Sequence, residues 1–157
     1  MANGKKNIFI SHVHSDDEAV FQLQDLLDKR GYQVRNSSID SSNPNNAKDP
    51  DYIKTGILAP RIQWAGTMVT LISPETHTSD WVDWEIEYAN KHDKRIVGVW
   101  LQGAKDADLP DGLELYADAL VGWNTDQIIA AIEGGIGTFS DASGNQRPSR
   151  NIKRYKC

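Results

Sequence analysis

Five short apolar segments alternate with helix-forming segments along this chain, and this alternation constrains the fold more than any other feature. The apolar segments span residues 7–11, 32–35, 67–72, 95–101 and 119–123. Most of them are nearly continuous in apolar residues, which is typical of strands buried on both faces of a sheet. Parallel neighbouring strands need crossover connections, which the intervening helices supply. The sequence therefore predicts a single α/β domain with a flavodoxin-like, five-stranded parallel sheet, strand order 2-1-3-4-5 and helices on both faces.

The segments between the predicted strands show helical spacing of apolar residues. Such spacing occurs after residue 16, over 51–62, more weakly over 113–117, and over 125–133. Pro60 is expected to end or kink the helix over 51–62, and Gly31 and Gly134 are expected to stop the helices before them. Residues 36–50 form a long polar stretch rich in Ser, Asn, Asp and Pro, which favours a functional or disordered loop.

The segment 73–89, which follows the third predicted strand, holds the main site candidate. Ser79 or Asp80 is a favourable N-cap for a helix on which Val82, Ile86 and Ala89 share the core-facing side. Glu85 lies on the neighbouring stripe with Trp81 and Tyr88, so we expect it at the rim of the core. A carboxylate beside aromatic rings is a candidate functional group, although the helix dipole also favours a Glu early in a helix without any function.

In a sheet of this order, ligands bind beyond the carboxyl ends of the strands, beside the point where the strand order reverses. That point lies between the first and third strands. The loops that follow Ser11 and Ser73 should therefore meet there, and both lead toward Glu85.

Three motifs resemble those of TIR domains that cleave NAD: Phe9-Ile10-Ser11, Ser73-Pro74, and Trp81-Val82 followed by Glu85-Ile86. The resemblance covers about residues 7–133 and is most specific for the TIR-like subfamily of bacterial Thoeris-type anti-phage systems. It implies an enzyme that releases nicotinamide from NAD and forms a cyclic ADP-ribose-type signal. That diffusible nucleotide would switch on a separate effector.

The same resemblance implies the site residues and the partners. Glu85 would be catalytic, and the substrate would be bound by Phe9, Ser11, His12, Ser73 and Trp81. NAD would be the substrate, with no further cofactor and no metal, and TIR–TIR contacts would give a homo-oligomer. The basic residues that some NAD-cleaving TIR domains carry after the first strand are absent here, where His12-Val13-His14 stands.

The sequence also bears on three other kinds of function: an adaptor, a phospho-accepting receiver and a zinc-binding protein. A non-catalytic TIR-type adaptor is the alternative, because a fold alone does not fix a function. A phospho-accepting receiver is disfavoured, because Ser73 ends the third strand where an acidic residue is needed, and Trp123-Asn124 stands where a lysine is needed. The four histidines share no helical face and Cys157 is the single cysteine, so a zinc-type site is not expected.

Composition sets the remaining expectations. The net charge of -5 argues against nonspecific nucleic-acid binding. No apolar run is long enough to span a membrane and no signal peptide is recognisable, so we expect a cytoplasmic protein without membrane contact. We expect a TIR-like domain over residues 1–134. Residues 135–157, with five basic residues and one acidic residue, should form a basic, flexible C-terminal tail.

Overall fold

The sheet lies at the centre of the molecule in a computed structural model that describes residues 7–13, 16–36, 58–134 and 139–142. Its strands are β1 (Asn7–Ser11), β2 (Gln33–Asn36), β3 (Thr67–Ile72), β4 (Arg95–Trp100) and β5 (Ala119–Val121). All pairs of neighbours are parallel and the order is β2-β1-β3-β4-β5, so the predicted topology is confirmed.

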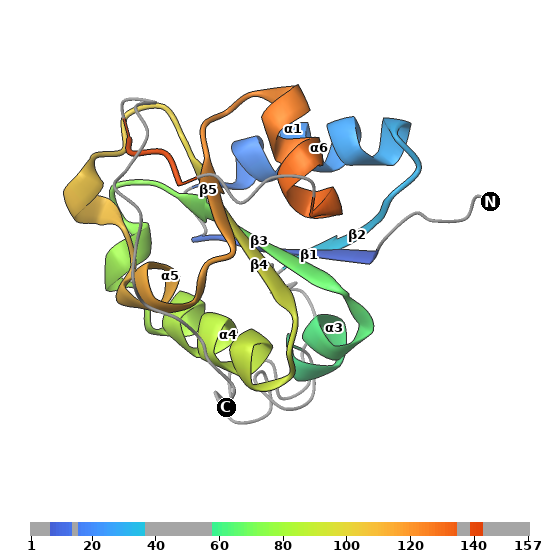
Figure 1. The fold of residues 1–157 in the computed structure, drawn as a ribbon, viewed down its shortest axis with the longest axis horizontal. Helices are drawn as coiled ribbons and strands as arrows, with labels where there is room; N and C mark the ends of the chain where they lie inside the picture. The colour runs from blue at the N-terminus through green and yellow to red at the C-terminus, as the bar shows by residue number, and fades with distance from the viewer. Residues whose placement is uncertain (1–6, 14–15, 37–57, 135–138, 143–157) are drawn as a thin grey trace, which may run out of the picture.

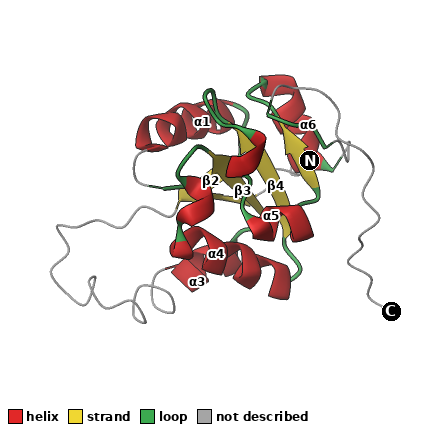
Figure 2. Ribbon diagram, turned by 90° about the vertical axis from the view of Figure 1, so that its left-hand side faces the viewer, coloured by secondary structure: helices red, strands yellow, loops and turns green. Residues whose placement is uncertain are grey.

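Helices cover both faces of the sheet, as Figures 1 and 2 show from two directions. One face carries α1 (Asp17–Lys29) and α6 (Thr125–Glu133), and the other carries α3 (Ala59–Trp64), α4 (Asp80–Lys91) and α5 (Asp111–Tyr116). Two short 3-10 helices, η4 (Thr76–Thr78) and η5 (Asp106–Asp108), lie in connections. Each face has its own apolar core, because β1, β3 and β4 bury side chains on both sides.

Local signals explain where the helices begin and end. The Ser79 hydroxyl accepts a hydrogen bond from the Val82 amide and so caps α4, one of the two predicted starts. Gly31 and Gly134 adopt φ values of 89° and 84° after α1 and α6, which confirms both predicted stops. Pro60 lies in the first turn of α3, where a missing amide hydrogen costs no helical bond, and the part of the expected helix before Leu58 lies outside the described residues.

Other expectations fall partly on residues that are not described. Of the polar stretch 36–50 only Asn36 is described, and the helix expected over 51–62 is described from Leu58 onward. Within the expected tail, residues 139–142 are described and pack on the domain. Phe139 forms a bridge with Leu120, and the Ser140 carbonyl accepts a hydrogen bond from Nε1 of Trp100 at 2.8 Å. In the described part of the chain, no helix has the length and apolarity to cross a membrane.

Close packing between α4 and α5 fixes the helix that carries Glu85. A Cβ atom at Gly112 would lie 2.8 Å from Cγ2 of Ile86, the residue next to Glu85. Real Cβ contacts are longer than this, so only glycine lets the two helices approach so closely. The position of α4 against the sheet is therefore set by its neighbours as well as by its own apolar face.

Candidate active site

Glu85 lies in the interior between α4 and the carboxyl end of β1, and only 1% of its surface is exposed. The Ser11 hydroxyl donates a hydrogen bond to its Oε1 at 2.6 Å. Among the described residues, its second oxygen Oε2 has no hydrogen-bond partner. The carboxyl group therefore lies deeper than the predicted rim, and it retains one unused acceptor.

Burial raises the pKa of Glu85 to about 8, because the charged form loses its hydration. The hydrogen bond from Ser11 and the positive charge of Arg61 act in the opposite direction and lower that pKa. A carboxyl group that changes charge near neutral pH inside a fold is a recognised mark of a functional site. Structural ion-pair networks also shift pKa values, but the rise here comes from burial, and the positive charge of Arg61 lowers the pKa of Glu85.

Arg61 of α3 is the principal site residue that sequence reasoning missed. Its Nη1 donates to the Asn36 carbonyl oxygen at 2.7 Å, which ties α3 to the carboxyl end of β2. Burial lowers the pKa of Arg61, Arg35 lowers it further, and the negative charge of Glu85 raises it. The guanidinium is therefore close enough to Glu85 for the two charges to interact. Its position follows from the folding of α3 next to β1, a contact that no local sequence motif reports.

A second polar network lies at the carboxyl end of β3. The Ser73 hydroxyl donates to Oδ2 of Asp16 at 2.7 Å and lies 3.1 Å from Oγ1 of Thr76. Burial raises the pKa of Asp16, and the bond from Ser73 partly offsets this effect. The loops after β1 and β3 therefore meet, as predicted, through a side-chain bond between residues 57 positions apart.

The other predicted site residues differ in how much surface they offer to a ligand. His12 is buried, and its Nε2 lies 3.0 Å from Oδ1 of Asp17. Trp81 keeps 38% of its surface exposed, one helical turn before Glu85. Phe9 is fully buried in the core on the α4 side and offers no surface to a ligand in this structure. The roles of these residues in substrate binding stay predictions.

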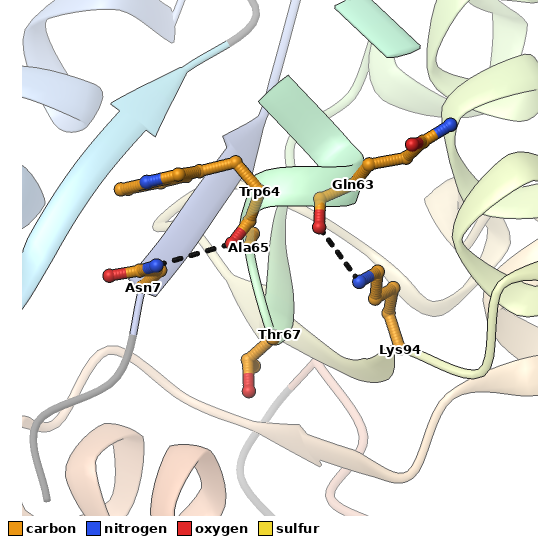
Figure 3. Close-up of a pocket in the computed structure, with 7 residues that line it drawn as sticks. Asn7, Gln63, Trp64, Ala65, Thr67 and Lys94 are labelled. Carbon is orange, nitrogen blue, oxygen red and sulfur yellow. Dashed lines mark hydrogen bonds between the residues drawn. The ribbon is translucent and has the colours of Figure 1, made fainter. Parts of the chain in front are cut away.

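Cavities away from Glu85 include two that are lined by described residues. One, of about 370 Å³, lies at the amino edge of the sheet, and its lining includes Asn7, Trp64 and Lys94. Figure 3 shows the Lys94 amine bonded to the Gln63 carbonyl and the Asn7 amide bonded to the Trp64 carbonyl. The other cavity, of about 640 Å³, lies beyond β4 and β5. Glu85 is not among the lining residues of either of these two cavities.

No arrangement suited to a metal ion occurs within the ranges that the structure describes, where no group of three or more His, Cys, Asp or Glu side chains is clustered for binding. The site contains a buried carboxyl group, buried hydroxyl groups and a partly buried guanidinium. Such groups bind sugar hydroxyls and phosphates, and a carboxylate stabilises a developing positive charge.

Comparisons with known proteins agree with this architecture. A solved structure described as a CMP N-glycosidase, BcmB, from Clostridium botulinum has a similar fold, with a TM-score of 0.53 and 16% sequence identity. The similarity covers 82% of this chain and 99% of that one. No curated protein matches the sequence. A family model described as Thoeris protein ThsB, TIR-like domain, matches residues 9–106, which is more than half of the chain and includes Ser11, Arg61 and Glu85. The chain therefore belongs to the family of Thoeris ThsB TIR-like domains.

Proposed function

We propose that this protein cleaves the bond between nicotinamide and ribose in NAD and makes a cyclic ADP-ribose-type signal. The observation that carries the proposal is the buried Glu85 carboxyl group, with Oε1 held by Ser11 and Oε2 without a partner among the described residues. A buried acceptor without a partner is costly in a folded protein and is uncommon outside functional sites. A ribose hydroxyl would satisfy Oε2.

The chemistry requires little from the protein besides charge and position. The C1′–N bond breaks with its electron pair going to nicotinamide, which leaves as a neutral molecule, while positive charge develops on the ribose. An ionised Glu85 stabilises that charge inside a site of low dielectric constant. If water attacks C1′ and loses a proton, the product is ADP-ribose. If a nucleophilic atom of the adenosine half attacks and loses its proton, the product is cyclic, and proximity favours this route.

Arg61 is suited to hold the diphosphate of the substrate. A guanidinium offers five donors in a planar fork that matches phosphate oxygens, and the bond to Asn36 orients this one near Glu85. Arg61 thus supplies a permanent positive charge to this region, where His12-Val13, and no arginine or lysine, directly follow β1. Trp81 supplies an exposed ring for stacking one helical turn from Glu85.

The direct test is to incubate the purified protein with NAD and to measure nicotinamide release and the nucleotide products by chromatography. Glu85→Gln keeps the size of the side chain and removes its charge, so we expect release to fall at least about a hundredfold. Glu87→Gln is the matched control, because Glu87 is an exposed glutamate on the same helix. Equal release from the wild type and Glu85→Gln, at protein concentrations that allow homo-oligomers to form, would leave the adaptor role as the better proposal.

CMP is the informative alternative substrate, because the similar fold of BcmB belongs to a CMP N-glycosidase. Its leaving group is a neutral pyrimidine, which departs more easily when protonated, so a protonated Glu85 would serve that reaction as a general acid. NAD has a cationic leaving group and benefits from the ionised form. With the pKa of Glu85 raised to about 8, NAD cleavage should accelerate as the pH rises toward 8, whereas CMP cleavage should slow.

The product also defines the partner. A cyclic nucleotide that leaves the enzyme would act on a separate effector protein, so no stable complex between the two is required. Adding the purified reaction products to such an effector, without the enzyme, tests this part of the proposal separately from the cleavage step.

A further inference from the structure

The cavity of about 640 Å³ beyond β4 and β5 shares no lining residue with the Glu85 site. Its size is in the range of cavities that bind small molecules. Residues from four parts of the chain meet there: α1, the end of β4 with the connection after it, the connection after β5, and the segment 139–142. The lining includes Glu18, Gln22, Trp100, Gln102, Trp123 and Ala142.

Two indole rings give this cavity its aromatic character. Trp100 is buried, and the bond from its Nε1 to the Ser140 carbonyl fixes the ring. Trp123 follows β5 and keeps 40% of its surface exposed, so part of its indole ring is open to solvent. An exposed indole at the edge of a cavity is a suitable surface for a flat ring.

The charged and polar groups of the lining restrict the ligand further. Glu18 supplies a carboxyl group, and Gln22 and Gln102 supply amides that donate and accept hydrogen bonds. No lysine or arginine lines the cavity within the described part of the chain, so nothing there would offset the charge of a phosphate. The lining therefore disfavours nucleotides and favours a group with positive charge.

We propose that this cavity binds a planar, cationic nitrogen heterocycle without a phosphate group, stacked on Trp123 with its charge near Glu18. Stacking of a cationic ring on an indole combines dispersion with cation–π attraction, and a nearby carboxylate adds to both. The amides of Gln22 and Gln102 suit a carboxamide or amino substituent on the ring. This inference is independent of the glycosidase proposal, since it uses none of the residues around Glu85.

Each of these groups also has a simpler explanation. Glu18 lies in the first turn of α1, where the helix dipole favours a carboxylate. Trp123 precedes the N-cap residue of α6 and would be exposed there without any ligand. The experiment must therefore separate a ring-binding site from two unrelated surface residues.

Three pyridine compounds of nearly equal shape provide that separation: 1-methylnicotinamide is a cation, nicotinamide is neutral and nicotinate is an anion. Their binding would be measured by isothermal titration calorimetry in the Glu85→Gln background, which weakens contributions from the candidate active site. We expect saturable binding in the order cation, neutral compound, anion, with about a tenfold difference between the first and the last.

Single substitutions added to that background assign the site. Trp123→Ala should weaken binding of the cation at least about tenfold, and Trp123→Phe should restore most of it. Glu18→Gln should remove the preference for the cation, while Phe21→Ala, which removes an exposed aromatic residue of α1 outside the lining, should change nothing.

The proposal is overturned by absence of saturable binding, by binding that survives Trp123→Ala, or by a charge preference that survives Glu18→Gln. Thermal unfolding of each variant identifies any that fails to fold. If Trp123→Ala fails to fold, binding of the cation by Trp123→Phe is compared with binding by the Glu85→Gln background instead. Nicotinamide release from NAD by Trp123→Ala without the Glu85 substitution should equal that of the wild type, so failure here is distinguishable from failure of the glycosidase proposal.

Discussion

The hydroxyl of Ser11 and Oε1 of Glu85 lie 2.6 Å apart and join the end of β1 to α4 across 74 positions of sequence. This bond favours the charged form of a carboxyl group whose surroundings favour the neutral form. The balance between the two effects leaves the pKa near 8, so a small change around Glu85 alters its charge at neutral pH.

The stability of the protein should depend on pH through Glu85. Below pH 4.5 this residue is protonated in both the folded and the unfolded chain. Between pH 4.5 and about 8 the unfolded chain loses the proton while the folded protein keeps it, so the free energy of unfolding falls with rising pH. The total loss is on the order of 5 kcal/mol. Urea unfolding of the wild type and Glu85→Gln at several pH values checks this.

Glu85→Gln cannot ionise, so its stability relative to the wild type should increase from pH 4.5 to 8 and level off above that. A difference between the two proteins that stays constant over this range would contradict a raised pKa. Glu87→Gln, which alters an exposed glutamate, should follow the wild type.

Ser11→Ala should move the pH profile of catalysis. The substitution removes the donor that favours ionised Glu85, so the pKa of Glu85 should rise above about 8. The rising limb of kcat/KM for NAD should shift to higher pH, and activity at pH 7 should fall by roughly tenfold or more. Steady-state kinetics between pH 6 and 9.5 measure both effects.

Thr70→Val is the matched control for this change. Thr70 pairs with Ser11 in the β1–β3 register, but its buried hydroxyl has no hydrogen-bond partner among the described residues. Replacing it with a methyl group of the same shape should leave the pH profile unchanged and stabilise the protein by about 1 kcal/mol. A profile shifted equally by both substitutions would mean that sheet packing, not the Ser11 bond, sets the pKa of Glu85.

Arg61→Gln should weaken NAD binding more than it slows chemistry, if the guanidinium holds the diphosphate. We expect KM to rise roughly tenfold or more with a smaller change in kcat, because a contact to phosphate is made equally in the ground state and the transition state. Lys94→Gln removes a cation at the opposite edge of the sheet (Figure 3) and should leave KM unchanged. An Arg61→Gln variant with unaltered KM would exclude the phosphate contact.

Gly112→Ala should disturb the position of Glu85 without touching the site. The added Cβ meets Ile86 at 2.8 Å, so α4 or α5 must move, at a cost of about 1–3 kcal/mol. The rate of nicotinamide release should fall as well, because a small displacement of a catalytic group strongly slows the reaction. Gly66→Ala is the control, since nothing lies within 4 Å of its added Cβ. Chemical denaturation and the release assay report the two effects.

The sheet could be predicted from the sequence because five strands carry the same strong signal, apolar runs separated by helical spacing. Strand ends were predicted to within one or two residues, and α4 was predicted from its cap and its apolar face. The meeting of the loops after β1 and β3 could be predicted because the carboxyl ends of parallel strands share one edge, whereas the roles of Ser11, Ser73 and Glu85 stay predictions.

The remaining features depend on tertiary packing. The depth of Glu85 could not be predicted, because helical spacing identifies a stripe but not how far a neighbouring helix closes over it. The place of Arg61 near Glu85 depends on how α3 packs beside β1 and α4, which no local pattern encodes. The partnership of Ser73 with Asp16 depends on how two loops meet, which no local pattern encodes.

The bond between Arg61 and the Asn36 carbonyl brings together the two boundaries of residues 37–57. One guanidinium thus anchors the exit from β2 and the entry to α3, so that stretch joins two positions that are already fixed. Through the packing of α3 on α4, this one side chain also couples the edge strand β2 to the helix that carries the carboxylate.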